Sequence, residues 1–199
     1  MVSDAPSDAP RDPLPPAFFP VSLNLEGRLC VVVGRPDDPE AIEKTAALRE
    51  VGATVRRVED PSAIRDEDVV DAFFVISTPH DAQLSTRLRA LADRHKFLLC
   101  CIDQPAYGFV AMQAIAKAGP ARITISTGGV SPAVGKRWRE AVQGALDDRF
   151  ARFMQALRER RTANRALEDP KARRSAAREA ARGFEVEIRL RYPDWFERS

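Results

Sequence analysis

The stretch Arg28-Leu29-Cys30-Val31-Val32-Val33-Gly34 decides the fold. Its apolar residues follow one another without alternation and stop at a glycine. A strand that is apolar on both faces is typical of the middle of a parallel sheet, which helices cover from both sides. Asp38 and Pro39 match the N-cap and the first position of a helix, so we expect a helix that begins there and runs to Gly52.

The same alternation continues along the chain. Apolar and β-branched runs predict further strands at 53–58, 72–77 and 97–102, and an amphipathic run predicts a helix at 81–94. Short units of strand, helix and strand imply right-handed crossovers and a parallel sheet with helices on both faces. The predicted fold class is therefore α/β, a Rossmann-like doubly wound parallel sheet.

Outside this alternation the pattern changes. Residues 109–115 are apolar, residues 121–126 alternate with period two, and Ser131-Pro132 starts a helix that we expect to continue past Arg152. Residues 184–191 alternate like an exposed strand. We divide the chain into a disordered proline-rich lead at 1–16, a Rossmann-like domain at 17–108, a smaller region at 109–146 and a basic, mainly helical region at 147–199.

The composition bounds the class of protein. The 199 residues suffice for one well-buried core with an appendage. No apolar run approaches the roughly 20 residues of a membrane helix, and the Met1 segment lacks the basic start and apolar stretch of a secretory signal. We therefore expect a cytoplasmic protein with no membrane partner. The three cysteines, Cys30, Cys100 and Cys101, lie in apolar runs without CxxC spacing, which favours buried small hydrophobes over a metal site.

The net charge of +2 hides an asymmetry. Residues 152–198 contain 13 Lys and Arg against 8 Asp and Glu, so this part carries +5 and the rest of the chain −3. A basic region of this kind attracts anionic partners over long distances. The chain has no helix-turn-helix, zinc or aromatic-rich RNA motif, so we expect no nucleic-acid partner.

The turn after the first strand, residues 34–40, is where a doubly wound fold binds a dinucleotide through the backbone N–H groups of glycines. Here it contains one glycine, and Asp37 and Asp38 lie where a pyrophosphate would bind. Two unit charges about 5 Å apart repel by roughly 3 kcal/mol at an effective dielectric constant of 20. One interpretation is that Asp38 caps the helix in place of the phosphate. Glu59 or Asp60, after the second strand, remains able to hold a ribose hydroxyl.

A second glycine cluster follows the strand at 121–126. The glycines Gly129 and Gly135 precede Lys136 and Arg137, but the spacing between the glycines and the absence of Ser or Thr after the lysine exclude a nucleotide phosphate loop. The segment Ser126-Thr127-Gly128-Gly129 instead indicates the end of a strand followed by a tight turn. Its exposed N–H groups are suited to hold a carboxylate.

Asp103 is the most interesting single carboxylate. It follows the predicted strand at 97–102, at the end of the sheet where open α/β folds place ligands. A carboxylate on such a half-buried rim suits proton transfer. The alternative is a cap or turn residue before Gln104 and Pro105.

Five segments occur together in a characteristic order and spacing: 19–34, 44–53, 74–78, 102–105 and Ile125-Ser-Thr-Gly-Gly-Val-Ser-Pro132. Together they resemble the precorrin-2 dehydrogenase/sirohydrochlorin ferrochelatase family, the N-terminal module of sirohaem synthase. The resemblance covers roughly 18–146, and its most specific part is the segment that ends at Pro132. Beyond Leu146 the chain matches only in being helical.

The resemblance implies NAD-dependent oxidation of precorrin-2 to sirohydrochlorin and, in some members, insertion of ferrous iron. It also implies a homodimer, in which the region beginning near Phe109 exchanges elements between subunits. Asp103 falls on the catalytic aspartate of the family. The tetrapyrrole loop corresponds to Ser126, Thr127, Gly128 and Gly129. The NAD contacts correspond to Pro39, Glu40, Asp60 and Pro61, together with Gly34, the one glycine that remains in the cofactor turn.

Two positions depart from the family pattern. A triple-glycine turn lies eight residues before the position of Lys44 in the family, whereas Gly34 lies ten residues before Lys44 here, and the asparagine usually found three residues before the catalytic aspartate is Cys100. The alternative function is therefore a tetrapyrrole chelatase or tetrapyrrole-binding protein that has lost NAD. Two roles also stay open for the arginines of the basic region: attraction of a polycarboxylate substrate, or the solvated face of a dimer helix. These arginines are Arg158, Arg160, Arg161, Arg165, Arg173 and Arg174.

Overall fold

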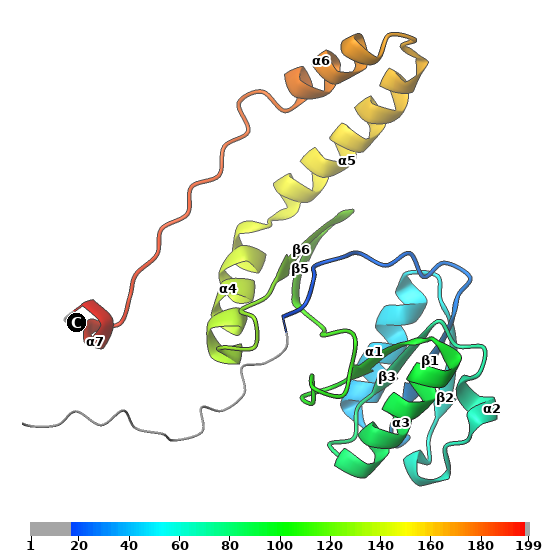
Figure 1. Ribbon diagram of the computed structural model, residues 1–199. Helices are drawn as coiled ribbons and strands as arrows, with labels where there is room; N and C mark the ends of the chain where they lie inside the picture. Colours follow the sequence, from blue (N-terminus) through cyan, green and yellow to red (C-terminus); the bar gives the residue numbers. More distant parts are fainter. Residues whose placement is uncertain (1–16, 198–199) are drawn as a thin grey trace, which may run out of the picture. The chain divides into compact units, whose positions relative to one another are not determined.

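The structure is a computed structural model that describes residues 17–197, so the predicted lead at 1–16 lies outside the described residues. The chain divides into two compact units (Figure 1). Unit 1 comprises the chain up to Ala114 together with Ile125–Arg137, and unit 2 comprises Ile115–Thr124 together with Trp138–Ser199. The domain boundaries after residues 108 and 146 stay predictions.

Unit 1 is built on four parallel strands in the order β2-β1-β3-β4. They are β1 (Leu29–Val33), β2 (Thr54–Val58), β3 (Phe74–Ser77) and β4 (Leu98–Cys101). At the end of β1, Val33 lies opposite Val58 on one side and Ser77 on the other. Since the chain leaves β1 for one side of the sheet and returns to the other, the strand order reverses between β1 and β3, where open α/β sheets bind ligands.

Helices cover both faces of this sheet. Helix α1 (Pro39–Glu50) packs through Ala41 and Leu48 on one face, against alternate strand residues such as Val32. The other face carries η1 (Pro61–Ala63), α2 (Asp66–Val69) and α3 (Ala82–His95), and Leu88 of α3 lies in the core there. Val31, Val32 and Val33 are fully buried. The predicted α/β doubly wound fold is confirmed.

The elements predicted in this unit agree with the structure to within about two residues at each end. The short elements η1 and α2 were not predicted, because three or four residues carry no periodic signal. The cysteines are free and buried as predicted, and burial raises the pKa of Cys100 to about 12. A thiol of that kind is inert as a nucleophile at neutral pH.

Unit 2 contains most of a two-stranded sheet, β5 (Ala114–Ala118) and β6 (Ala121–Ile125), and several helices. The side chain of Gln143 joins β5 to α4 (Pro132–Ala145): it accepts from the backbone N–H of Lys117 (2.9 Å) and donates to its carbonyl oxygen (3.0 Å). The remaining elements are α5 (Asp148–Ala163), η2 (Asn164–Ala166), α6 (Pro170–Ala180) and α7 (Asp194–Glu197). Strand β6 and the mainly helical C-terminal region agree with prediction, whereas β5 was not predicted.

Two predictions for this part of the chain are wrong. The helix expected to run past Arg152 is interrupted, because Asp147 accepts from the N–H of Phe150 (2.8 Å) and starts a new helix there. No strand forms at 184–191 within the described residues. The ring of Phe184 packs instead on Phe150 and Phe153 of α5, with centroids 6.0 and 5.2 Å apart.

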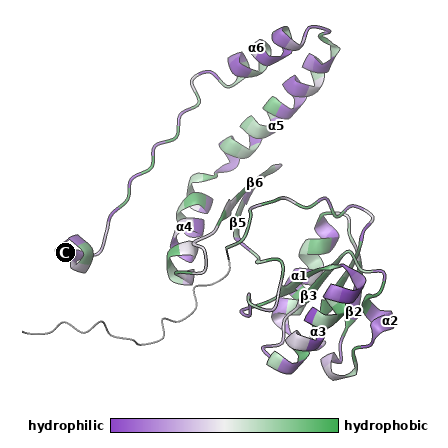
Figure 2. Cartoon of the chain, viewed as in Figure 1, coloured by the Kyte–Doolittle hydropathy of each residue, from purple (hydrophilic) through white to green (hydrophobic). Residues whose placement is uncertain are grey.

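The basic region is solvent-exposed. Helix α5 of this region carries both hydrophilic and hydrophobic residues (Figure 2). The six arginines between 158 and 174 that are named above are all exposed. Their exposure fits both roles that the sequence leaves open. No helix among residues 17–197 is long and apolar enough to cross a membrane.

The packing of α3 on the sheet yields a first prediction. Leu88→Ala removes a fully buried side chain from the core beneath α3. We expect it to lower the free energy of unfolding by about 2–5 kcal/mol, the range for buried leucines that leave a cavity. Urea denaturation followed by circular dichroism measures this loss. Ile42→Ala on α1, where the side chain is 51% exposed, is the matched control and should change stability by less than about 0.5 kcal/mol. Equal losses in the two variants would contradict the assigned core.

Candidate functional site

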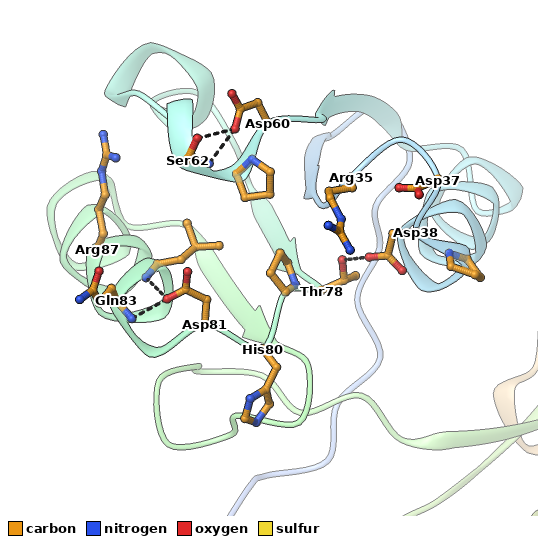
Figure 3. A pocket seen from close by; sticks show the side chains of 14 residues that line it. Arg35, Asp37, Asp38, Asp60, Ser62, Thr78, His80, Asp81, Gln83 and Arg87 are labelled. Carbon is orange, nitrogen blue, oxygen red and sulfur yellow. Dashed lines mark hydrogen bonds between the residues drawn. The ribbon is translucent and has the colours of Figure 1, made fainter.

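A cavity of about 960 Å³ lies at the carboxyl ends of the central strands (Figure 3). Its walls come from three segments: the turn after β1 (Arg35 to Pro39), the segment after β2 (Asp60 to Ser62), and the segment from Thr78 through the start of α3 to Arg87. Its volume lies within the roughly 300–1,000 Å³ of small-molecule sites. The topology explains the position, because all three segments follow strands that end at the same edge of the sheet.

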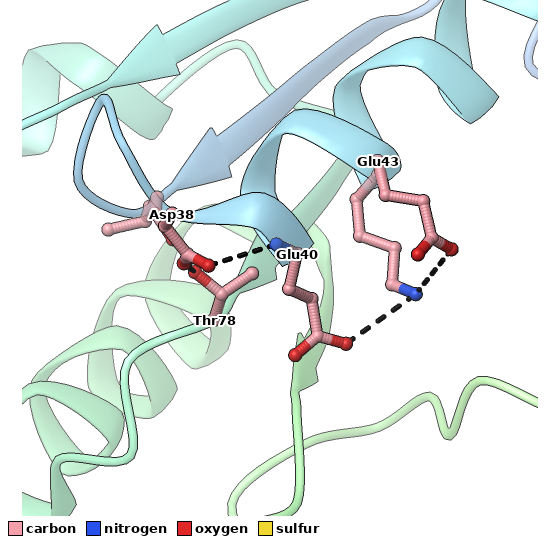
Figure 4. Close-up of polar contacts among 6 residues, drawn as sticks. Asp38, Glu40, Glu43 and Thr78 are labelled. Atoms are coloured by element: carbon pink, nitrogen blue, oxygen red, sulfur yellow. Dashed lines mark hydrogen bonds and ion pairs between the residues drawn. The ribbon is translucent and has the colours of Figure 1, made fainter.

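The turn after β1 is organised by the carboxylate of Asp38 (Figure 4). One oxygen accepts from the backbone N–H of Glu40 (3.0 Å), so Asp38 is the N-cap of α1, and the other accepts from the hydroxyl of Thr78 after β3. The Thr78 hydrogen bond, helped by the N–H groups of the first helical turn, lowers the pKa of Asp38 below its ordinary value. These contacts stabilise the charged form of Asp38, which interacts favourably with the positive end of the helix.

Gly34 permits this close arrangement. A Cβ atom at this position would lie 2.8 Å from the Cβ of Ala41 and 3.1 Å from Oδ2 of Asp38. Glycine is required here for the approach of α1 and of the Asp38 carboxylate to the end of β1. No space at this point of the turn is left for a larger side chain.

Arg57 on β2 braces the same turn. Its Nη2 donates to the carbonyl oxygens of Gly34 (3.0 Å) and Arg35 (2.9 Å). Its Nη1 reaches the hydroxyl of Thr45 on α1 at 3.4 Å. These contacts fix the backbone on both sides of the turn, so the conformation that brings Asp38 to the helix end is anchored at several points.

Asp60, after β2, holds a second carboxylate at the rim of the cavity. Its Oδ1 accepts from the backbone N–H of Ser62 (3.0 Å) and from the Ser62 hydroxyl (2.6 Å), and these bonds lower the pKa of Asp60. Both bonds use the same oxygen of the carboxylate. Pro61 lines the cavity beside it.

The charge of the cavity is mixed. Four carboxylates line it, from Asp37, Asp38, Asp60 and Asp81, against the guanidinium groups of Arg35 and Arg87 and the imidazole of His80. Asp81 caps α3, accepting from the N–H groups of Gln83 (2.8 Å) and Leu84 (3.1 Å). The excess of carboxylates opposes an anionic ligand, and the arginines partly offset it.

The structure brings some of the predicted cofactor residues together. Pro39, Asp60 and Pro61 line the cavity, as does Asp38. Gly34 and Glu40 do not line it: Gly34 is buried beneath the turn, and the Glu40 carboxylate lies 3.5 Å from the ammonium of Lys44. Sequence reasoning missed the segment after β3, from Thr78 to Arg87. The signal that was available is its place directly after a buried strand.

Asp103 lies apart from this cavity. It follows β4 and has a left-handed backbone with φ of 55°, which few residues other than glycine, asparagine and aspartate adopt readily. Its side chain is exposed, so the expected half-buried position is wrong. The next residue, Gln104, is buried and accepts from the hydroxyl of Ser85 (2.7 Å), which anchors the turn beneath the exposed carboxylate.

The predicted tetrapyrrole loop forms a turn held by its own hydrogen bonds. The hydroxyl of Thr127 donates to the carbonyl of Ser131 (3.1 Å) and accepts from its N–H (3.4 Å), and the N–H of Gly128 donates to the Ser126 hydroxyl (3.2 Å). Gly128 and Gly129 have positive φ, of 62° and 78°. The loop does not line the cavity at the strand ends, and its role as a tetrapyrrole anchor stays a prediction.

Metal-ligating side chains do not gather in the part of the chain that the structure describes. No group of three or more His, Cys, Asp or Glu residues is placed to hold a metal ion there. The site is therefore characterised by its carboxylates, its two arginines and its open volume.

Comparisons with known proteins identify relatives. The siroheme synthase of Gluconacetobacter diazotrophicus is 30% identical over 172 residues, which are 74% of this chain and 36% of that protein. The precorrin-2 dehydrogenase of Methanosarcina barkeri is 28% identical over 156 residues, covering 67% of this chain and 69% of that protein. The chain thus spans about a third of the length of the siroheme synthases it matches, as in Hahella chejuensis (33%). No protein-family model matches the chain.

Among solved structures, SirC, a precorrin-2 dehydrogenase, superposes with a TM-score of 0.63 at 21% sequence identity, covering 81% of this chain and 88% of SirC. This likeness confirms the fold. The siroheme synthase and precorrin-2 dehydrogenase relatives show that the chain belongs to the family formed by precorrin-2 dehydrogenases and the matching module of siroheme synthases.

Proposed function

We propose that this protein oxidises precorrin-2 to sirohydrochlorin in sirohaem biosynthesis, with NAD as the electron acceptor. The observation that carries the proposal is the match to a precorrin-2 dehydrogenase over two thirds of both chains. The cavity at the strand-order reversal supports it, because this is where doubly wound folds place a dinucleotide. The homodimer implied by the resemblance and the cytoplasmic location expected from the composition stay predictions.

The residues of the cavity fit one part of NAD and not another. Asp60, at the end of β2, stands where a carboxylate accepts hydrogen bonds from the ribose hydroxyls. The N-terminus of α1, the usual place of the pyrophosphate, is capped by Asp38 instead. We therefore assign the ribose to Asp60, and the N–H groups of α1 can receive a phosphate only where the Asp38 carboxylate leaves them.

The chemistry requires a hydride acceptor and a base. NAD supplies the acceptor when bound, and the reaction converts precorrin-2 and NAD to sirohydrochlorin, NADH and a proton. We assign the base to Asp103, whose carboxylate is exposed at the end of β4 and so is open to a large, flat substrate. The buried Gln104 beneath it keeps the turn in place while the carboxylate accepts the proton. The turn at 126–129 is the proposed anchor of the tetrapyrrole.

A second candidate function is favoured by one observation. The carboxylate of Asp38 at the N-terminus of α1 suits a tetrapyrrole-binding protein or chelatase that works without NAD. Among the described residues we find no feature that favours ferrous iron insertion, so the leading proposal is confined to the oxidation. Measurement of NAD binding separates the two candidates, since the second requires that none be detected at millimolar NAD.

The role of Asp103 is tested by Asp103→Asn. Asparagine also tolerates the left-handed backbone, so the fold should persist while the base is lost. We expect kcat for anaerobic oxidation of precorrin-2 to fall by about 10²–10⁴, the usual contribution of a general base. Sirohydrochlorin absorption and NADH formation report the rate. Full activity in Asp103→Asn would remove Asp103 from the mechanism, and absence of sirohydrochlorin with the unaltered protein would overturn the proposed function.

The role of Asp60 is tested by NAD binding alone. We expect Asp60→Asn to weaken NAD binding about tenfold, because a hydrogen bond to a charged group contributes roughly 1.5–3 kcal/mol. Asp37→Asn removes the same charge from the same cavity without touching the ribose position, and it should not weaken binding. Isothermal titration calorimetry measures both. An unchanged or higher NAD affinity in Asp60→Asn would show that Asp60 does not hold the ribose.

A further inference from the structure

The N-terminus of α1 is occupied by an anion that belongs to the chain itself. Oδ1 of Asp38 accepts from the N–H of Glu40 at 3.0 Å, and Oδ2 accepts from the hydroxyl of Thr78. Both oxygens of the carboxylate are thus engaged at the helix end. The donors come from two elements that meet only in the folded chain, the start of α1 and the segment after β3 (Figure 4).

The Asp38 carboxylate, the Thr78 hydroxyl and the Ala41 methyl group together fill the space beside Gly34. Oδ2 of Asp38 lies 3.1 Å from the position that a Cβ of Gly34 would take. In doubly wound folds this space, above the first glycine and in front of the helix, receives the pyrophosphate. A pyrophosphate and the Asp38 carboxylate therefore exclude each other there, by volume and by charge.

The backbone holds Asp38 in this position. Its N–H donates to the carbonyl of Arg35 (3.2 Å), its carbonyl accepts from the N–H of Ile42 (3.0 Å), and Arg57 binds the carbonyls of Gly34 and Arg35. The Thr78 hydroxyl and the N–H groups of α1 lower the pKa of Asp38, so these contacts favour its charged form. The neighbouring Asp37 is exposed and makes no contact of this kind in the described structure.

We propose that Asp38 is a built-in competitor of the dinucleotide pyrophosphate, which must displace this carboxylate from the N-terminus of α1 in order to bind there. The inference rests on the proposed function for the identity of the ligand. It assigns to Asp38 the control of cofactor affinity: the protein binds NAD weakly because its own carboxylate holds the phosphate place. Removal of the carboxylate alone then tightens NAD binding.

The test compares Asp38→Gly with the unaltered protein and with the control Asp71→Asn, which removes an exposed carboxylate outside the cavity, using the full chain without precorrin-2. Titration calorimetry, or ligand-observed NMR for millimolar affinities, measures the binding of NAD and of adenosine. We expect Asp38→Gly to bind NAD at least about tenfold more tightly, equivalent to about 1.4 kcal/mol. Adenosine, which has no phosphate, should bind equally to both. Asp71→Asn should change NAD affinity by less than about threefold, because distant exposed charges are screened.

Glycine is an acceptable N-cap and serine a favourable one, so Asp38→Ser provides a second variant if Asp38→Gly fails to fold. It should shift NAD affinity in the same direction. The inference is overturned if neither variant binds NAD more tightly than the unaltered protein, or if adenosine gains as much as NAD. The proposed function fails on a different observation, the absence of sirohydrochlorin formation by the unaltered protein, so the two failures are distinguishable.

Discussion

Burial of β1 on both faces is the constraint on which the rest of the structure depends. Val31, Val32 and Val33 are fully buried, and burial of such a side chain stabilises the fold by about 1.5–3 kcal/mol. This gain requires a helix on each side of the sheet, hence a crossover after every strand. The crossovers place the segments after β1, β2 and β3 at one edge, where Asp38, Asp60 and Thr78 line a single cavity.

The parts of the fold that could be predicted are those whose residues repeat a pattern over a long stretch. Every residue from Leu29 to Val33 favours a buried strand, and the spacing of the leucines in α3 favours an amphipathic helix along its whole length. The wrong predictions concern positions at which a single contact determines whether a helix or a strand forms. Asp147 interrupts an otherwise continuous helical pattern by capping α5. Alternation at 184–191 indicates a strand, but a strand needs a partner, and Phe184 packs on α5 instead.

The candidate site was predictable to the extent that strand order determines it. The places of Pro39, Asp60 and Pro61 follow from their positions directly after buried strands. The role of Thr78 could not be predicted, because its hydroxyl donates to the carboxylate of Asp38, 40 residues earlier in the chain. The left-handed backbone of Asp103 likewise depends on the turn that the buried Gln104 anchors, and no local pattern of residues reports it.

A tethered carboxylate and a free dinucleotide compete on unequal terms. Asp38 is part of the turn, so it loses little further freedom in binding the helix end, whereas a ligand loses translational and rotational freedom estimated at about 4–15 kcal/mol. The ligand must recover this loss from contacts elsewhere in the cavity. Asp60 and the two arginines are the groups placed to supply them. On the proposed assignment, affinity for a dinucleotide is set by the competition between two anions at one helix terminus, and the turn Arg35-Pro-Asp-Asp38 takes part in that competition without altering the fold that carries it.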